Sequence, residues 1–254
     1  MLKNRFRYFI VAATLLATIA LPVQPVFAAG GQPPAQAPCV IKNFTLPDVS
    51  LGEDNPDTKF IEIIFTVDEH CRMVETSRRV LDSVPADVLQ AKPEFSQSVT
   101  ASSTTTSLSQ ESVTITAATT NTAHVKIYQL DCCGITTIAL QTDHAWTWTS
   151  TTTSLSGNGL TNASWCCYWW HLTAGPTMSH GVYSSSHIYA KGSASYVCYN
   201  SGPVPFCIGP TLKYPMTFYT WLHMYNNGVA NASGTSYSGT VIPLGQVVYQ
   251  FWKT

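Results

Sequence analysis

Charged side chains are scarce in this sequence, and they are unevenly distributed. Only 11% of the 254 residues are Asp, Glu, Lys or Arg, and the formal net charge is −1. Residues 29–122 hold twelve of the acidic residues, whereas residues 123–254 hold only Asp131 and Asp143. Acidic residues outnumber basic ones, so we expect no nucleic-acid partner. The break in charge predicts an acidic N-terminal segment over 29–95 and a separate domain over 123–254.

The motifs of common hydrolases and metal sites are also lacking. Residues 123–254 contain no Glu, which is unfavourable for the paired carboxylates of a glycosidase. The stretch 234–239 resembles the Gly-x-Ser-x-Gly motif of serine hydrolases but is one residue too long to match it. Asp143 and His144 are adjacent, so on a strand they point to opposite faces and cannot pair directly. The histidines match no metal-ligand spacing, and no Cys-x-x-Cys occurs. We therefore expect no metal and no other cofactor, and the sequence favours a protein that is not an enzyme.

Long hydrophobic runs are missing beyond the N-terminal region. There, three basic residues precede an apolar run from residue 8 to residue 22, and residues 26–28 fit the small-x-small pattern that signal peptidase recognises. A membrane anchor is the alternative, but Pro22 and Pro25 interrupt the run before it reaches spanning length. We predict a signal peptide over 1–28 and a secreted mature chain without a transmembrane segment. Removal of the peptide leaves ten basic and fourteen acidic residues, a net charge of −4.

Eight cysteines are present, and in an exported chain they predict disulfides. They are Cys39, Cys71, Cys132, Cys133, Cys166, Cys167, Cys198 and Cys207. Neighbouring cysteines have Cα atoms about 3.8 Å apart, which is below the usual disulfide range. The doublets 132–133 and 166–167 are therefore expected to pair with each other. Cys198 and Cys207 flank a Gly- and Pro-rich loop and form the next pair. Cys39 and Cys71 then pair by elimination. The alternative for the cysteines as a whole is a structural zinc site.

Secondary-structure signals in the acidic segment are mixed. Residues 60–67 are rich in Ile and Phe and predict a strand. Residues 68–83 approximate a helical apolar stripe that Pro85 ends, so a helix is expected there. The stretch 96–122 is dominated by Ser, Thr and Ala, and it is interpreted as a linker or as edge strands.

Beyond residue 122 the apolar residues alternate with a period of two, which is typical of strands. The expected strands are 124–130, 135–142, 145–150, 164–172, 187–190, 194–199, 216–225, 229–237 and 245–252. Turn residues separate them at 156–159, 181, 191–192 and 226–228. The predicted fold is mainly β, an antiparallel sandwich-like domain preceded by a small mixed N-terminal segment.

Aromatic residues are concentrated in the β domain. The densest stretch, residues 165–171, is expected to be one strand, either buried on both faces or exposed as a platform for stacking on sugars. The candidate binding residues are Trp146, Trp148, Tyr168, Trp169, Trp170 and His171. A second alternating row, Tyr219, Trp221, His223 and Tyr225, is interpreted as core packing.

The composition favours a secreted, disulfide-stabilised binding or surface-interaction protein. A charge-poor surface rich in hydroxyls and aromatics suits an extracellular glycan or a cell-wall polymer as ligand. Two alternatives stay open. One is an extracellular hydrolase, since Ser and His are plentiful. The other is a membrane-active β protein, in which the stretch 96–122 would line a pore.

Overall fold

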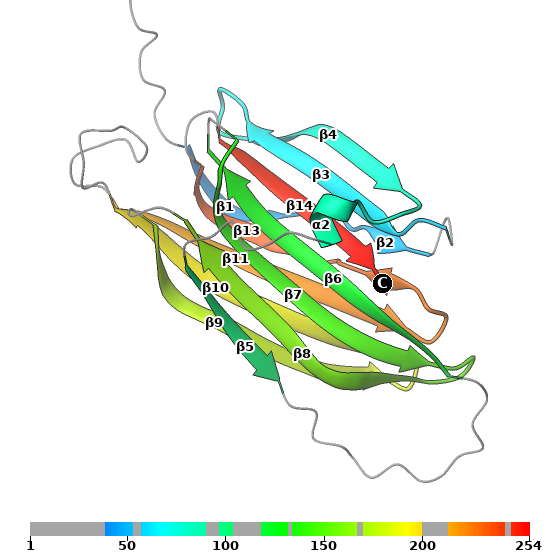
Figure 1. Ribbon diagram of the computed structural model, residues 1–254. Coiled ribbons are helices and arrows are strands. Elements are labelled where there is room, and N and C mark those ends of the chain that lie inside the picture. Colours follow the sequence, from blue (N-terminus) through cyan, green and yellow to red (C-terminus); the bar gives the residue numbers. More distant parts are fainter. Residues whose placement is uncertain are drawn as a thin grey trace, which may run out of the picture. The chain divides into compact units, whose positions relative to one another are not determined.

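The fold consists of two antiparallel β-sheets packed face to face (Figure 1). The computed structural model describes residues 39–52, 57–89, 97–103, 118–131, 134–166, 170–199, 213–241 and 245–254. Within these ranges nearly all regular structure is strand, and α2 (Ala86–Leu89) is a single helical turn. The predicted fold class is therefore confirmed.

The first sheet has the strand order β1-β13-β11-β10-β9. These strands are β1 (Cys39–Thr45), β13 (Ser236–Val241), β11 (Lys213–Tyr225), β10 (His187–Tyr199) and β9 (Trp170–Ser184). Two short strands, β12 (Ala230–Asn231) and β2 (Ser50–Leu51), extend the sheet from the end of β11. β9, β10 and β11 are long and pair almost along their whole length, which gives this sheet a continuous outer surface.

The second sheet has the order β4-β3-β14-β6-β7-β8-β5. Its strands are β4 (Met73–Leu81), β3 (Phe60–Val67), β14 (Gln246–Lys253), β6 (Thr119–Leu130), β7 (Thr136–Trp148), β8 (Thr153–Trp165) and β5 (Gln97–Ser103). β3 and β4 come from the acidic segment, yet β3 pairs directly with β14 near the end of the chain. Residues 37–254 form one compact unit, so the change in charge does not coincide with a boundary between compact units.

The core lies between the sheets and follows from the alternation of side chains along each strand. On β6, Ala123, Val125 and Ile127 are fully buried, while the residues between them face outward. On β11, Phe218 and Leu222 are fully buried in the same way. Burying one such large apolar side chain contributes about 1.5–3 kcal/mol relative to leaving it exposed. Alternation of this kind is what makes the two sheets pack as a sandwich.

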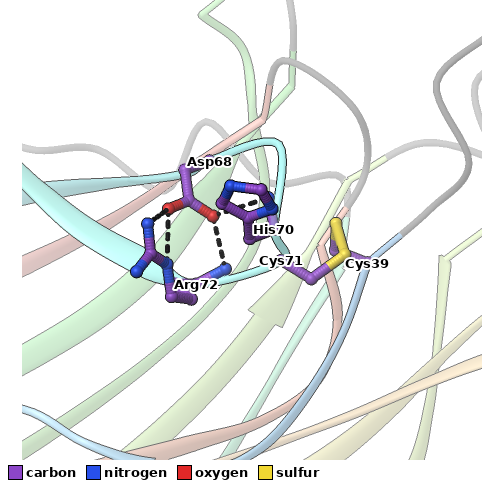
Figure 2. Close-up of a disulfide and its surroundings, with 5 residues drawn as sticks. All are labelled: Cys39, Asp68, His70, Cys71 and Arg72. Carbon is purple, nitrogen blue, oxygen red and sulfur yellow. Dashed lines mark hydrogen bonds and ion pairs between the residues drawn. A yellow bond between two sulfur atoms is a disulfide. The ribbon is translucent and has the colours of Figure 1, made fainter.

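The helix expected over 68–83 is wrong, because the chain turns at Asp68 and continues as β4. The Asp68 carboxylate accepts hydrogen bonds from the backbone N–H groups of His70 (2.9 Å) and Arg72 (2.8 Å) and from Arg72 Nε (2.7 Å) (Figure 2). Cys71 adopts a left-handed φ of 59°, which is incompatible with a continuing helix. β4 then pairs with β3 at the edge of the second sheet.

One predicted disulfide, Cys39–Cys71, is confirmed (Figure 2). It joins β1 of the first sheet to the β3–β4 turn of the second, so it links the two layers. Cys166 and Cys198 are also disulfide-bonded. The pairing of Cys198 with Cys207 and the pairing between the two doublets stay predictions, because Cys207, Cys132, Cys133 and Cys167 lie outside the described residues.

Several predicted boundaries differ from the observed ones. The expected turns at 156–159, 181 and 191–192 lie inside β8, β9 and β10. The expected strands 135–142 and 145–150 form one long strand, β7. The expected strands 187–190 and 194–199 likewise form one long strand, β10. The expected strand 164–172 is divided between the end of β8 and the start of β9, and 229–237 is divided between β12 and β13. The turn at 226–228 is confirmed.

Gly192 explains why a turn signal fails inside a strand. A Cβ at this position would point toward the second sheet and would collide with the hydroxyls of Thr142 and Thr161. Thr142 Oγ1 is also 2.6 Å from Thr220 Oγ1, so a small buried hydroxyl cluster occupies the space between the sheets. The glycine is therefore required for close approach of the two layers, not for a turn.

Part of the Ser/Thr-rich stretch forms edge structure. Residues 97–103 are β5, an edge strand paired with β8, and residues 119–122 are the start of β6. Residues 104–117 lie outside the described residues.

Candidate functional site

Trp146 and Trp170, two members of the predicted aromatic platform, lie in the core. Trp146 is 0% exposed and Trp170 is 1% exposed, so neither ring offers a surface to a ligand. Trp148 packs against the core and stacks on Trp146 with ring centroids 5.2 Å apart. His171 is exposed at the start of β9, and its ring contacts Tyr199. Tyr168 and Trp169 lie outside the described residues.

The second aromatic row is on the surface, which overturns its interpretation as core packing. On β11, Phe218, Thr220, Leu222 and Met224 are buried and point toward the second sheet. Tyr219, Trp221, His223 and Tyr225 occupy the alternate positions and therefore point outward, with Tyr219 49% exposed. The row is thus available to a ligand.

Neighbouring strands extend this row into a wider surface. On β10, the outward positions His187, Tyr189 and Lys191 lie opposite Tyr225, His223 and Trp221. From β9, the exposed Tyr183 stands beside them. We call this surface the aromatic face. It comprises Tyr183, His187, Tyr189, Lys191, Tyr219, Trp221, His223 and Tyr225.

Ring contacts make much of the aromatic face continuous. The centroid of Tyr183 is 4.6 Å from that of Tyr189, and the centroid of His187 is 4.5 Å from that of Tyr225. Trp221 and His223 stack with centroids 5.3 Å apart. Such pairs contribute about 0.5–1.5 kcal/mol each beyond their burial, so the rings hold one another in fixed orientations.

Two glycines let the rings lie close to the backbone. An added Cβ at Gly181 would be 2.7 Å from Tyr189 Oη, and one at Gly234 would be 2.8 Å from Trp221 Cε3. Any side chain at these positions would displace the ring above it. The glycines therefore position Tyr189 and Trp221 on the face.

A hollow of about 390 Å³ lies at the Tyr219–Trp221 end of the aromatic face. The described residues that line it are Thr177, Ser179, Lys191, Gly192, Ser193, Tyr219, Thr220, Trp221, Gly234 and Ser236. They supply two aromatic rings, several hydroxyls and one cation, and none of these ten residues is Asp or Glu. Thr177 Oγ1 and Ser193 Oγ are 2.7 Å apart, so part of the hydroxyl lining is already held in place.

Electrostatics on the aromatic face are set by neutral histidines and Lys191. His187 Nε2 and His223 Nδ1 are 2.9 Å apart. Partial burial lowers the pKa of both imidazoles, and the neighbouring His187 lowers the pKa of His223 further. Lys191 Nζ lies 5.4 Å from the centre of the Trp221 ring, within cation–π range. The face is therefore weakly charged at neutral pH.

Within the described ranges, no three His, Cys, Asp or Glu side chains lie close enough together to hold a metal ion. No helix in the same ranges is both long and apolar enough to cross a membrane.

Comparisons with protein-family models, with curated proteins and with solved structures found no match to this chain.

Proposed function

We propose that this protein is a secreted binding module that holds a saccharide in the hollow at the Tyr219–Trp221 end of the aromatic face. The observation that carries the proposal is the hollow beside Tyr219 and Trp221, where ring surfaces and Ser/Thr hydroxyls occur together. The site differs from the platform expected at residues 165–171, but the chemistry is the one that the sequence predicts.

Saccharides match this combination of groups. One side of a sugar ring presents C–H groups that pack on an aromatic face, while its hydroxyls both donate and accept hydrogen bonds. Tyr219 and Trp221 are two residues apart on one strand, which separates them by roughly 6.5–7 Å along the sheet, comparable to the length of one sugar ring. The volume of the hollow falls within the usual range of about 300–1,000 Å³ for small-ligand sites.

Charge supports a neutral ligand. Lys191 is the one charged residue among the ten that line the hollow, and its ammonium group lies over the rings of Trp221 and Tyr189. A strongly ionic ligand would need more countercharge than these residues provide.

Two further observations support secretion. The basic and apolar start of the chain has the form of a cleavable signal peptide. The Cys39–Cys71 disulfide is typical of proteins that fold in an oxidising compartment.

A binding screen tests the proposal. The mature chain would be applied to an array of neutral and acidic glycans and soluble cell-wall polymers, beside a Tyr219→Ala/Trp221→Ala variant. We expect the wild type to retain a set of neutral glycans and the variant to lose them. Binding that is absent for every glycan, or that is the same in both proteins, would contradict the proposal.

A further inference from the structure

A second group of polar residues lies on the opposite side of the molecule, on the outer face of the second sheet. His124 projects from β6, Asp143 from β7, and Thr254 follows β14. His124 pairs with Asp143 across β6 and β7, and the backbones of Thr254 and Thr122 exchange hydrogen bonds of 2.8 and 3.0 Å. Three adjacent strands therefore bring a hydroxyl, an imidazole and a carboxylate together.

The distances are those of an activated hydroxyl. His124 Nδ1 is 2.7 Å from Asp143 Oδ1, and His124 Nε2 is 3.0 Å from Thr254 Oγ1. An ionised Asp143 can only accept, so Nδ1 carries the proton and donates it. His124 Nε2 then has a free lone pair and accepts the hydrogen bond from the Thr254 hydroxyl. A nucleophile and a base within about 2.6–3.2 Å, with the base oriented by a third group, is the pattern of nucleophilic catalysis.

The surroundings hold the base and the carboxylate in place. Gln141 Nε2 donates to both oxygens of Asp143, at 2.9 and 3.0 Å. The His124 ring stacks on Trp252 with centroids 4.9 Å apart and planes within 9°. The side chains of His124 and Asp143 are 17% and 23% exposed, whereas Thr254 is exposed. A substrate therefore reaches the hydroxyl first, while the imidazole and carboxylate behind it are shielded.

We propose that Thr254, His124 and Asp143 form a nucleophilic site that hydrolyses small carboxylic esters. Thr254 Oγ1 attacks the ester carbonyl carbon while its proton moves to His124 Nε2. The tetrahedral intermediate then collapses, the bond from carbon to the alcohol oxygen breaks, and His124 gives the proton to the departing alcohol. His124 Nε2 next takes a proton from a water molecule, whose oxygen attacks the carbonyl carbon of the acyl-threonine. The bond from that carbon to Thr254 Oγ1 then breaks, His124 returns the proton to Oγ1, and the carboxylic acid leaves. This activity is independent of saccharide binding, since it uses the other sheet.

The sequence contained these residues without indicating their association. His144, the neighbour of Asp143 in the sequence, points to the opposite face of β7 and is 1% exposed. The partner that the sheet provides is His124, nineteen residues earlier and on the adjacent strand.

Covalent labelling and ester hydrolysis on the full chain test the proposal. A fluorophosphonate would form a bond from phosphorus to Thr254 Oγ1 and release fluoride, and peptide mass mapping would locate the label. The variants are Thr254→Val, which removes the hydroxyl at nearly constant shape, Thr254→Ser, which keeps it, His124→Gln and Asp143→Asn. His70→Gln changes an exposed histidine elsewhere and serves as the control. Thermal unfolding of each variant confirms that it is folded.

We expect label at Thr254 in the wild type and in Thr254→Ser. Hydrolysis of p-nitrophenyl acetate should fall at least 100-fold in Thr254→Val and His124→Gln and at least tenfold in Asp143→Asn, and stay within twofold in His70→Gln. Label absent from Thr254, or hydrolysis by Thr254→Val at the wild-type rate, would overturn the proposal. A rate that falls in His124→Gln but not in Thr254→Val would also overturn it, because the imidazole would then act alone.

Discussion

The buried side chain of His144 makes the stability of the fold depend on pH. It is 1% exposed, its Nδ1 donates to the Ala145 carbonyl at 2.7 Å, and its Nε2 is 3.0 Å from His180 Nδ1. Its pKa is lowered from 6.5 to about 4, mainly by burial; the hydrogen bond to the Ala145 carbonyl opposes this decrease, and the neighbouring His180 contributes to it. The folded protein thus holds this imidazole neutral where the unfolded chain would protonate it.

The sign of the pH effect follows from this depressed pKa. Above pH 6.5 the imidazole is neutral in both states and affects stability little. As the pH falls from 6.5 toward 4, the unfolded chain binds a proton and the folded protein does not, so the free energy of unfolding decreases by about 3 kcal/mol from this group. Urea unfolding between pH 7 and pH 4 should show a flatter dependence for His144→Gln than for the wild type. Equal slopes in the wild type and in His144→Gln would contradict the assignment.

Among the elements, strands with at least one buried face were predictable from the sequence, whereas the exposed strand β4 was not. The stretches 60–67 and 245–252 are both rich in branched and aromatic side chains, and both form strands, β3 and β14. β4 is an exposed edge strand in which no residue is fully buried, so its sequence carries no period of two. Its pairing with β3 decides its conformation, and only the fold reveals that pairing.

The candidate site was predictable in composition but not in orientation. Both faces of β11 carry large side chains, since Phe218 and Leu222 alternate with Tyr219 and Trp221. Alternation therefore shows which residues share a face, but it cannot say which face is buried. The cross-strand register supplies that information, because it places Lys191 beside Trp221 and a lysine seldom faces a core.

The disulfide between β1 and the β3–β4 turn gives an element-scale prediction. Cys39 and Cys71 are 32 residues apart, and closing a loop of that length restricts the unfolded chain by about 3.5 kcal/mol. We expect Cys39→Ser/Cys71→Ser to lower the free energy of unfolding by roughly this amount in urea titrations. Glu69→Ser, in the same exposed turn, should change it by less than about 0.5 kcal/mol. A double variant as stable as the wild type would show that the bridge adds nothing.

At the scale of the whole molecule, export makes a separate prediction. If residues 1–28 are a signal peptide, protein recovered from the outside of an expressing cell should begin at Ala29. N-terminal sequencing and intact mass would show this directly. Replacing Ala28 by Phe, which puts a large side chain where a small one is required, should leave the leader attached. Exported wild-type protein that retains residues 1–28 would refute the predicted cleavage.

The two faces of the sandwich carry different chemistry. The aromatic face lies on the first sheet, while His124, Asp143 and Thr254 lie on the second, and the core between them is continuous. Substitutions on one outer face should therefore leave the other unaffected, because residues that share no partners contribute nearly additively.

Calorimetric titration of the tightest-binding neutral oligosaccharide tests the central claim most directly. The wild type would be compared with Trp221→Ala, and with Tyr183→Ala as a matched aromatic control that lies on the same face but does not line the hollow. Loss of the Trp221 ring should raise Kd at least tenfold, about 1.4 kcal/mol, while Tyr183→Ala should bind within threefold of the wild type. Equal Kd values for the wild type and Trp221→Ala would contradict the assignment of saccharide binding to the hollow beside Tyr219 and Trp221.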